Sequence, residues 1–182
     1  DLARRNLDLT HLNENALNHP RVRVINQDAF SFLQEAQVQY GAILIDLTDP
    51  RTEAVTKLYS VEGYQLCRRL LSPGGVLVTQ ATSPYHARRA FWCIGRSLEE
   101  AGFRVYPYHV LVPSFGEWGF QLGACEKLPV EQLAFSVPLR FLRPELFPGM
   151  LLFAPDMEGI EVESNRLDRP VLARYYRQEW GE

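Results

Sequence analysis

The sequence contains few cysteines, and none of them belongs to a C-x-x-C pair. The three that occur, Cys67, Cys93 and Cys125, are widely spaced and odd in number. Such spacing is typical of reduced thiols in a cytosolic compartment, and it argues against a disulfide framework or a zinc site. The sequence therefore predicts a cytoplasmic protein without a metal-ligand cluster.

Long apolar runs and an excess of basic residues are also missing. No run approaches the ~18 consecutive apolar residues of a membrane-spanning helix, and no signal peptide is visible. The formal net charge of −3 gives none of the positive field on which nucleic-acid binding depends. Nucleic acid is therefore not expected as a partner.

An initiator methionine is lacking at the start of the chain. Residues 1–5 (D-L-A-R-R) instead read like the interior of a helix. We therefore expect the chain to be a fragment of a longer protein. What is present is ordinary for a soluble domain, with 46% apolar and 23% charged residues in a length of 182. That length is enough for one domain with a real core.

The stretch from Tyr40 to Pro50 organises the rest of the chain. Its apolar run over residues 42–45 is typical of a strand buried on both faces of a parallel sheet. Asp46 follows the run directly, and Asp49 precedes the proline at which the chain turns. Ligands bind outside the carboxyl ends of the strands in open α/β sheets, so the two carboxylates are candidates for chemistry. Capping of the turn and of the next helix is the alternative explanation.

The predicted elements alternate between strands and helices. Apolar or alternating runs indicate strands at residues 21–26, 42–45, 75–80, 103–112 and 118–125. Ser60 is expected to begin a helix that runs to Leu71, and Ser83 with Pro84 to begin another that ends at Gly102. The last two strands are expected to form an antiparallel hairpin. This order predicts an α/β fold with a Rossmann-like sheet.

The first strands of such a sheet, with their glycine-rich loop, are not found in the sequence. Gly74 and Gly75 precede a strand instead of opening a helix, so they are no substitute. We therefore expect the chain alone to bind a nucleoside poorly and to be inactive. We also expect strand 42–45 to have an unpaired edge, at which the chain forms a homo-oligomer. Alternatively, strand 21–26 moves into the vacant place, or an upstream segment that has been cleaved stays bound there.

Residues 126–182 differ in character from the rest. Six prolines between positions 129 and 170 break this region into short pieces. The sequence therefore predicts two parts, a partial Rossmann-like domain over residues 1–125 and an appendage of small helices over residues 126–182 that packs on the sheet.

Several short motifs keep one order and spacing over roughly residues 20–125. They are Q-D-A at 27–29, D-L-T-D-P at 46–50, K-L-Y at 57–59, G-Y-Q-L at 63–66, Q-A-T-S-P-Y at 80–85 and V-P-S-F-G-E-W-G-F at 112–120. These motifs resemble those of the spermidine synthases, or polyamine aminopropyltransferases. The tail around residues 165–176 is similar to the bacterial branch in which this domain follows a membrane-spanning region. The resemblance implies the fold of S-adenosylmethionine-dependent methyltransferases and a tether to the membrane through an upstream region.

The resemblance also implies an activity. This family transfers an aminopropyl group from decarboxylated S-adenosylmethionine, a co-substrate, to a diamine such as putrescine. By resemblance Asp46 is the base and Asp49 the second anchor of the amine. A diamine is cationic at neutral pH because aliphatic amines titrate near pH ~10, so carboxylates suit it. The sulfonium donor carries its own leaving group, so neither a metal nor a true cofactor is expected.

Further site residues follow from the same resemblance. Asp28 corresponds to the residue that hydrogen-bonds the adenine amino group, with Ala29 beside it, although Asp28 could instead cap the following helix. Leu47 stands where the family has a small hydroxyl residue on the nucleoside side. On the acceptor side, Gln80 is a candidate amine contact or a satisfied polar strand end.

The segment at 113–120 departs from the family pattern. Phe115 replaces a tyrosine and so removes a hydroxyl group. Glu117 is a candidate amine anchor in its place, or a surface partner of an arginine. Residues 51–54 (R-T-E-A) replace the usual G-P-A as well. These changes leave open which amine is the acceptor.

Two other functions fit the same pattern. A methyltransferase that uses S-adenosylmethionine shares acidic strand ends near positions 28 and 46, but it does not require a second carboxylate at Asp49. A binding or assembly module that has lost catalysis would explain Leu47 and Phe115.

Overall fold

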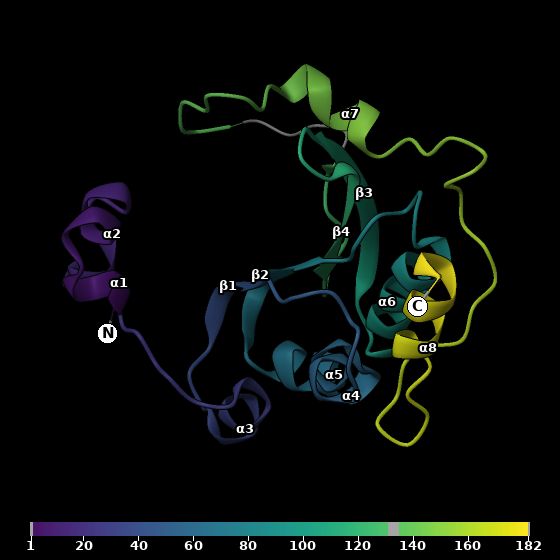
Figure 1. The fold of residues 1–182 in the computed structure, drawn as a ribbon, viewed down its shortest axis with the longest axis horizontal. Helices are drawn as coiled ribbons and strands as arrows, with labels where there is room; N and C mark the ends of the chain where they lie inside the picture. Colours follow the sequence, from purple (N-terminus) through teal and green to yellow (C-terminus); the bar gives the residue numbers. More distant parts are fainter. Residues whose placement is uncertain (1, 131–134, 182) are drawn as a thin grey trace.

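Runs of β-branched and aromatic residues form one mixed four-stranded sheet at the centre of the computed structural model, which describes residues 2–130 and 135–181 (Figure 1). The strand order is β1-β2-β4-β3. The strands are β1 (Tyr40–Ile45), β2 (Leu71–Gln80), β3 (Arg104–Val112) and β4 (Gly116–Ala124). β1 and β2 are parallel, whereas β2–β4 and β4–β3 are antiparallel. The expected terminal hairpin is therefore confirmed.

The sheet has one covered and one open face. Strand residues Ile43, Leu77, Gly123 and Val105 are neighbours in register and face the helices. The next residues in each strand point the other way, and among them Leu44 is 76% exposed. The core therefore lies on the helix-covered side, and its largest fully buried side chains include Tyr59, Tyr64, Phe91 and Leu98.

Two helices cover that face. α5 (Val61–Arg69) begins where expected, because the Ser60 hydroxyl oxygen accepts a hydrogen bond from the Gly63 amide at 3.0 Å. α6 (Arg88–Glu100) buries Phe91, Ile94 and Leu98 at helical spacing, as the sequence predicts. The expected start of α6 at Ser83 is wrong. The Ser83 hydroxyl instead accepts from the Tyr85 and His86 amides, which closes a separate turn before the helix.

Gly119 allows the sheet and α6 to approach closely. A Cβ atom at this position would overlap the Phe91 ring and lie 2.9 Å from the Thr82 carbonyl oxygen. The Gly119 amide donates to that carbonyl at 2.7 Å. Thr82 has a φ of 59°, a left-handed conformation that strains a β-branched residue. The turn after β2 is thus held in an unusual shape by its neighbours.

The N-terminal part forms helices apart from the sheet. α1 (Leu2–Arg5), α2 (Leu7–Leu12) and a 3₁₀ turn η1 (Ala16–Asn18) lie to the left of the sheet in Figure 1. The predicted strand at 21–26 is wrong. These residues form an exposed connection without regular structure, in which Val22, Val24 and Ile25 are each about 40% exposed. α3 (Ala29–Glu35) then begins at the N-cap Asp28.

β1 does not lie inside the sheet. The sequence predicted a strand buried on both faces, but among the described residues β1 pairs with β2 alone and forms one edge. Its residues Ala42 and Leu44 are exposed. The unpaired edge expected for strand 42–45 is therefore confirmed within the described residues, whereas burial on both faces is wrong. An apolar run indicates burial without indicating which faces of the strand are covered.

The connection between β1 and α5 contains α4 (Glu53–Thr56) and the 3₁₀ turn η2 (Lys57–Tyr59). The region after β4 contains η4 (Pro144–Leu146), α7 (Phe147–Met150) and α8 (Leu172–Trp180). α8 lies along α6 (Figure 1), whereas α7 contacts strand β3 of the sheet. Its residues Leu172, Tyr175 and Tyr176 belong to the main hydrophobic core. The division into parts at residue 125 stays a prediction.

Asn165 connects this C-terminal region to the rest of the fold through hydrogen bonds. Its amide side chain donates to the Thr56 carbonyl at 2.9 Å and accepts from the Leu172 amide at 3.3 Å. Its backbone carbonyl accepts from the Val61 amide, and its backbone amide donates to the Ser97 hydroxyl. Asn165 is 1% exposed, so all these bonds are buried.

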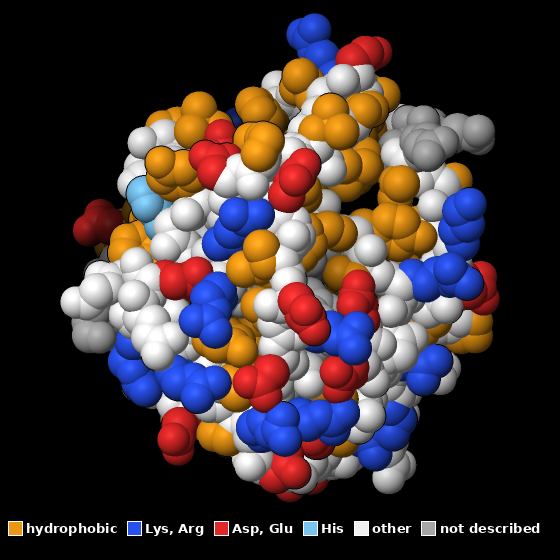
Figure 2. Space-filling model, turned by 90° about the vertical axis from the view of Figure 1, so that its right-hand side faces the viewer, with side chains coloured by type: hydrophobic (Ala, Val, Ile, Leu, Met, Phe, Trp, Pro, Cys, Tyr) orange, Lys and Arg blue, Asp and Glu red, His pale blue; other side chains and the backbone are white. Residues whose placement is uncertain are grey.

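The surface over the C-terminal region carries both signs of charge. Figure 2 shows acidic and basic side chains interspersed there. Glu163 pairs with Arg169 and Arg174, and Arg166 pairs with Glu62 and Glu100. Within the described residues, no helix combines the length and apolar character needed to cross a membrane.

Candidate active site

A cleft of about 550 Å³ opens at the carboxyl ends of β1 and β2. Three separate segments contribute side chains to it: the loop after β1, the end of β2 and the turn that leads into β4. The lining residues are Asp46, Leu47, Thr48, Asp49, Arg51, Thr52, Val55, Gln80, Phe115 and Trp118. The structure thus brings five of the predicted site residues, Asp46, Leu47, Asp49, Gln80 and Phe115, into one cleft.

Asp46 presents its carboxylate to solvent at the end of β1. In the described part of the chain, no hydrogen bond or ion pair occupies this carboxylate. Its negative charge nonetheless helps to raise the pKa of the buried Tyr59. Asp46 is therefore an accessible acceptor for a cationic group or for a proton.

The Asp49 carboxylate, unlike that of Asp46, is bound by another side chain. Its Oδ2 accepts a hydrogen bond of 2.8 Å from the Tyr176 hydroxyl, which reaches over from α8. Its Oδ1 is buried and has no hydrogen-bond partner among the described residues. A buried acceptor without a partner costs roughly 1–3 kcal/mol. This unused oxygen in a cleft is therefore a candidate contact for a ligand that donates hydrogen bonds.

Tyr59 forms part of the support beneath the two carboxylates. Burial raises the pKa of Tyr59 well above its ordinary range, and the nearby Asp49 and Asp46 charges raise it further. The hydroxyl therefore stays protonated. It accepts a long hydrogen bond of 3.5 Å from Gln80 Nε2.

Gln80 is fully engaged with the protein. Its Nε2 donates to the Leu47 carbonyl at 3.0 Å, and its Oε1 accepts from the Thr82 amide at 2.6 Å. It thereby ties the loop after β1 to the strained turn after β2. Of the two interpretations from the sequence, these contacts favour the satisfied polar strand end.

Two aromatic rings form one wall of the cleft. Phe115 is 60% exposed, and its ring centroid lies 5.1 Å from that of Trp118. Sequence reasoning did not single out Trp118 as a site residue. The pairing register identifies it, because Phe120 is paired with Gln80 and Trp118, two residues earlier in β4, faces the same side of the sheet.

Glu117 does not line the cleft. Its carboxylate contacts His109 Nδ1 at 2.7 Å, and His109 Nε2 lies 2.7 Å from the Leu152 carbonyl oxygen. The surface partner expected for Glu117 was an arginine, but the partner is a histidine on the neighbouring strand β3. His109, held by Glu117, thus links the sheet to the C-terminal region.

The residues expected on the nucleoside side are not gathered in one place. Asp28 caps α3 by accepting from the Ser31 amide at 2.9 Å, and it pairs with Lys57 at 3.0 Å. These interactions, led by the bond from the Ser31 amide, lower the pKa of Asp28 to about 2. Ala29 lines a different hollow of about 430 Å³ beside β1, whereas Leu47 lines the main cleft.

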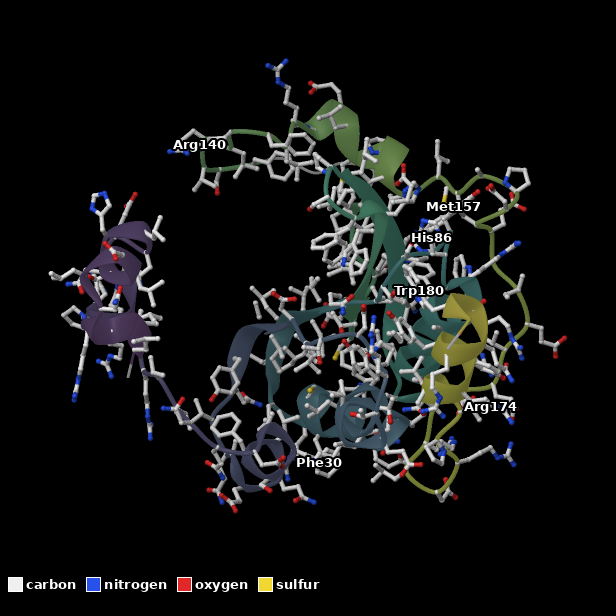
Figure 3. The ribbon with its side chains drawn as sticks, viewed as in Figure 1. Phe30, His86, Arg140, Met157, Arg174 and Trp180 are labelled. Carbon is white, nitrogen blue, oxygen red and sulfur yellow. The ribbon has the colours of Figure 1, made fainter. Side chains whose placement is uncertain are left out.

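The C-terminal helix α8 packs against the loop after β1, which lines the cleft. Arg177 donates to the Arg51 carbonyl at 3.3 Å, and the Arg51 guanidinium lies 5.8 Å from the Tyr176 ring centroid. At the end of α8, Trp180 contacts His86 with centroids 5.4 Å apart (Figure 3). Sequence reasoning missed Tyr176 and Arg51, since only the fold brings the distant α8 to this loop.

Across the described residues, no group of three or more His, Cys, Asp or Glu side chains is arranged to hold a metal ion.

Residues 1–134 match the family model described as "Spermine/spermidine synthase domain". The chain is 44% identical over 173 residues to polyamine aminopropyltransferase 2 of Ralstonia nicotianae, covering 94% of this chain and 34% of the relative. It is 38% identical over 184 residues to polyamine aminopropyltransferase of Oceanobacillus iheyensis, covering 99% of this chain and 36% of the relative. The chain thus spans about a third of the length of the curated relatives it matches.

Solved structures agree with these sequence matches. A crystal structure of spermidine synthase in complex with the transition-state analogue AdoDATO superposes with a TM-score of 0.70 at 18% identity, covering 99% of this chain and 57% of that one. Spermidine synthase from Thermotoga maritima gives 0.67 at 19% identity, covering 99% and 56%. At such identities the likeness shows the fold, and the α/β Rossmann-like fold expected from the sequence is confirmed.

Proposed function

Because the chain belongs to the spermine/spermidine synthase family, we propose that it supplies the amine-acceptor side of an aminopropyltransferase active site. The observation that carries this proposal is the pair of carboxylates in the cleft. Asp46 is open to solvent, and Asp49 has a buried Oδ1 without a hydrogen-bond partner in the described chain. A diamine with two cationic ends matches two carboxylates on one cleft.

The proposed reaction joins a diamine to decarboxylated S-adenosylmethionine as co-substrate. A neutral amine nitrogen attacks the aminopropyl carbon that is bonded to the sulfonium, so a C–N bond forms as the C–S bond breaks. The electron pair of the C–S bond passes to sulfur, which leaves as a neutral thioether. Asp46 accepts the proton that the attacking ammonium must lose, as a positioned general base does.

The remaining cleft residues suit the rest of the acceptor. Asp49 Oδ1 is proposed to bind the second ammonium. Phe115 and Trp118 are proposed to cover the apolar methylene groups between the two nitrogens, where apolar burial is favourable. Gln80 supports the loop through the Leu47 carbonyl. Glu117, which faces the other side of the sheet, is not included among the amine contacts.

The nucleoside side is proposed from the resemblance alone. Asp28, Ala29 and Leu47 are assigned to it. Asp28 already binds Ser31 and Lys57, but a carboxylate offers about four lone-pair sites and so retains capacity for an amino group. Homo-oligomerisation, a cytoplasmic location and a membrane tether stay predictions.

The test is replacement of the base in the intact protein. Asp46→Asn keeps the size of the side chain but removes its basicity, so turnover of decarboxylated S-adenosylmethionine with putrescine should fall by about 10² or more. Product formation by the parent and the variant is measured by mass spectrometry, with Asp156→Asn, an exposed replacement of the same kind outside the cleft lining, as the control. Equal turnover in the parent and Asp46→Asn would exclude Asp46 as the base.

The same assay separates the competing functions. Transfer of a labelled methyl group from S-adenosylmethionine would identify a methyltransferase, for which the second carboxylate has no use. Binding of putrescine without turnover in any pairing would identify a non-catalytic module.

A further inference from the structure

We propose that Tyr176 is a positioning residue for Asp49, so that the C-terminal helix α8 sets the acceptor specificity of the cleft. This inference rests on the proposed function. It concerns a residue that lies outside the matched family model, which ends at residue 134.

The contact itself is direct. The Tyr176 hydroxyl donates to Asp49 Oδ2 at 2.8 Å, and Tyr176 is 1% exposed. The other carboxylate oxygen, Oδ1, is buried and lacks a partner within the described chain. A carboxylate with one oxygen bound by a fixed donor can no longer rotate freely about its χ2 torsion. The second oxygen is therefore held at one position, with its capacity to accept a hydrogen bond unused.

Tyr176 is fixed from several sides. Its ring belongs to the main hydrophobic core together with Leu172 and Tyr175 of the same helix. The Arg51 guanidinium lies 5.8 Å from the ring centroid, and Trp180 packs at 5.9 Å. A side chain held in this way is preorganised, which is what an orienting residue requires.

The hydroxyl also keeps its proton under working conditions. Burial raises the pKa of Tyr176 to about 12, and the hydrogen bond to Asp49 contributes to this. Tyr176 therefore remains a donor near neutral pH. It can hold the Asp49 carboxylate but cannot itself serve as a base there.

The consequence concerns acceptor length. Asp46 and Asp49 would bind the two ends of one diamine, so the position of Asp49 determines which spacing of nitrogens fits. A loosely held Asp49 would accept a wider range of spacings at lower affinity. Loss of the Tyr176 hydroxyl should therefore weaken binding of the preferred diamine. It should also reduce the difference in affinity between that diamine and longer or shorter ones.

The matched pair of variants is Tyr176→Phe and Tyr175→Phe. Both remove one hydroxyl from a nearly buried tyrosine of α8, and the Tyr175 hydroxyl makes a bond of 3.5 Å to Glu163 instead. In the intact protein, Tyr176→Phe should raise the KM for the preferred diamine about tenfold, the effect of ~1.4 kcal/mol. The KM for decarboxylated S-adenosylmethionine should not change, and Tyr175→Phe should leave both constants at parental values.

A KM does not depend on how much enzyme is folded, so partial unfolding of Tyr176→Phe would lower the apparent kcat without imitating this result. A second arm uses Asp49→Asn, to which adding Tyr176→Phe should bring no further rise in the diamine KM. Parental kinetics in Tyr176→Phe, or equal effects of both tyrosine variants, would overturn the inference while leaving the proposed function intact. If the parent neither turns over nor binds putrescine, cadaverine or 1,3-diaminopropane, the proposed function fails and the inference fails with it.

Discussion

Asp28 shows at the scale of a residue how a helix cap makes stability depend on pH. Its pKa falls from an ordinary 3.8 to about 2 in the folded chain, because the Ser31 amide and Lys57 favour the charged form. A group with a depressed folded pKa stabilises the fold above its unfolded pKa, and this contribution is lost as the pH falls through the folded value. Asp28 should therefore stabilise the chain above pH ~4 and lose that effect between pH ~4 and ~2.

Asp28→Asn tests this expectation, since asparagine is an equally good N-cap but carries no charge. The urea midpoint of the variant should lie below that of the parent at pH 7, and the gap should narrow as the pH falls from 4 towards 2.5. Asp156→Asn, an exposed replacement of the same kind, serves as the control. A gap of constant size from pH 7 to 2.5 would contradict the assigned interactions.

The residues in and around the cleft differ in whether the sequence alone could identify them as site residues. Asp46 and Asp49 could be found, because they end an apolar run and precede a proline, which is a local pattern. Tyr176 could not, because its contact with Asp49 spans 127 positions and depends on how α8 packs. For Glu117 the sequence left two interpretations open, an amine anchor or a surface ion pair, because its residue type fits both and only the fold shows which face of β4 lines the cleft.

At the scale of elements, Asn165 joins the C-terminal region to the loop before α5. Asn165→Ala would leave the Thr56 carbonyl and the Leu172 amide without their buried partners. Each unsatisfied buried group costs roughly 1–3 kcal/mol. The free energy of unfolding measured in urea should therefore fall by about 2 kcal/mol or more.

The control for Asn165→Ala is Arg169→Ala in the same loop. Arg169 pairs with Glu163 in an exposed ion pair, which is worth about 0–1 kcal/mol. Equal losses of unfolding free energy in the two variants would show that the hydrogen bonds of Asn165 do not stabilise the fold more than an exposed ion pair does.

Elements were predictable where a local signal governs them. The Ser60 cap marks the start of α5, and the spacing of Phe91, Ile94 and Leu98 marks the face of α6. The alternating residues 21–26 failed as a strand because a strand also needs a partner for its backbone groups. None of the described strands pairs with this segment. Similarly, the hydroxyl of Ser83 closes a local turn, so the helix begins only at Arg88.

For the whole molecule, the two edges of the sheet differ. β3 contains Pro107 and begins at Arg104, both of which discourage pairing with another chain, whereas β1 carries neither proline nor charge. We therefore expect the isolated 182-residue chain to self-associate through β1 in a concentration-dependent manner. Sedimentation velocity over a range of concentrations measures this association.

Leu44→Lys should shift the isolated chain towards the monomer. Leu111→Lys is the matched control, because Leu111 is 68% exposed on the opposite edge strand and Leu44 is 76% exposed on β1. Leu111→Lys should therefore associate like the parent. A parent chain that sediments as a monomer at every concentration would refute the role of the β1 edge.

The bond between Tyr176 and Asp49 also has a consequence for the timing of synthesis. A ribosome adds about 5–20 residues per second, so the 127 positions between the two residues take roughly 6–25 s to translate. During that interval the loop after β1 has already emerged, but Asp49 has no partner in α8. The nascent chain therefore carries both carboxylates before Asp49 can be oriented by Tyr176, and the acceptor cleft is complete only after Tyr176 has left the ribosome.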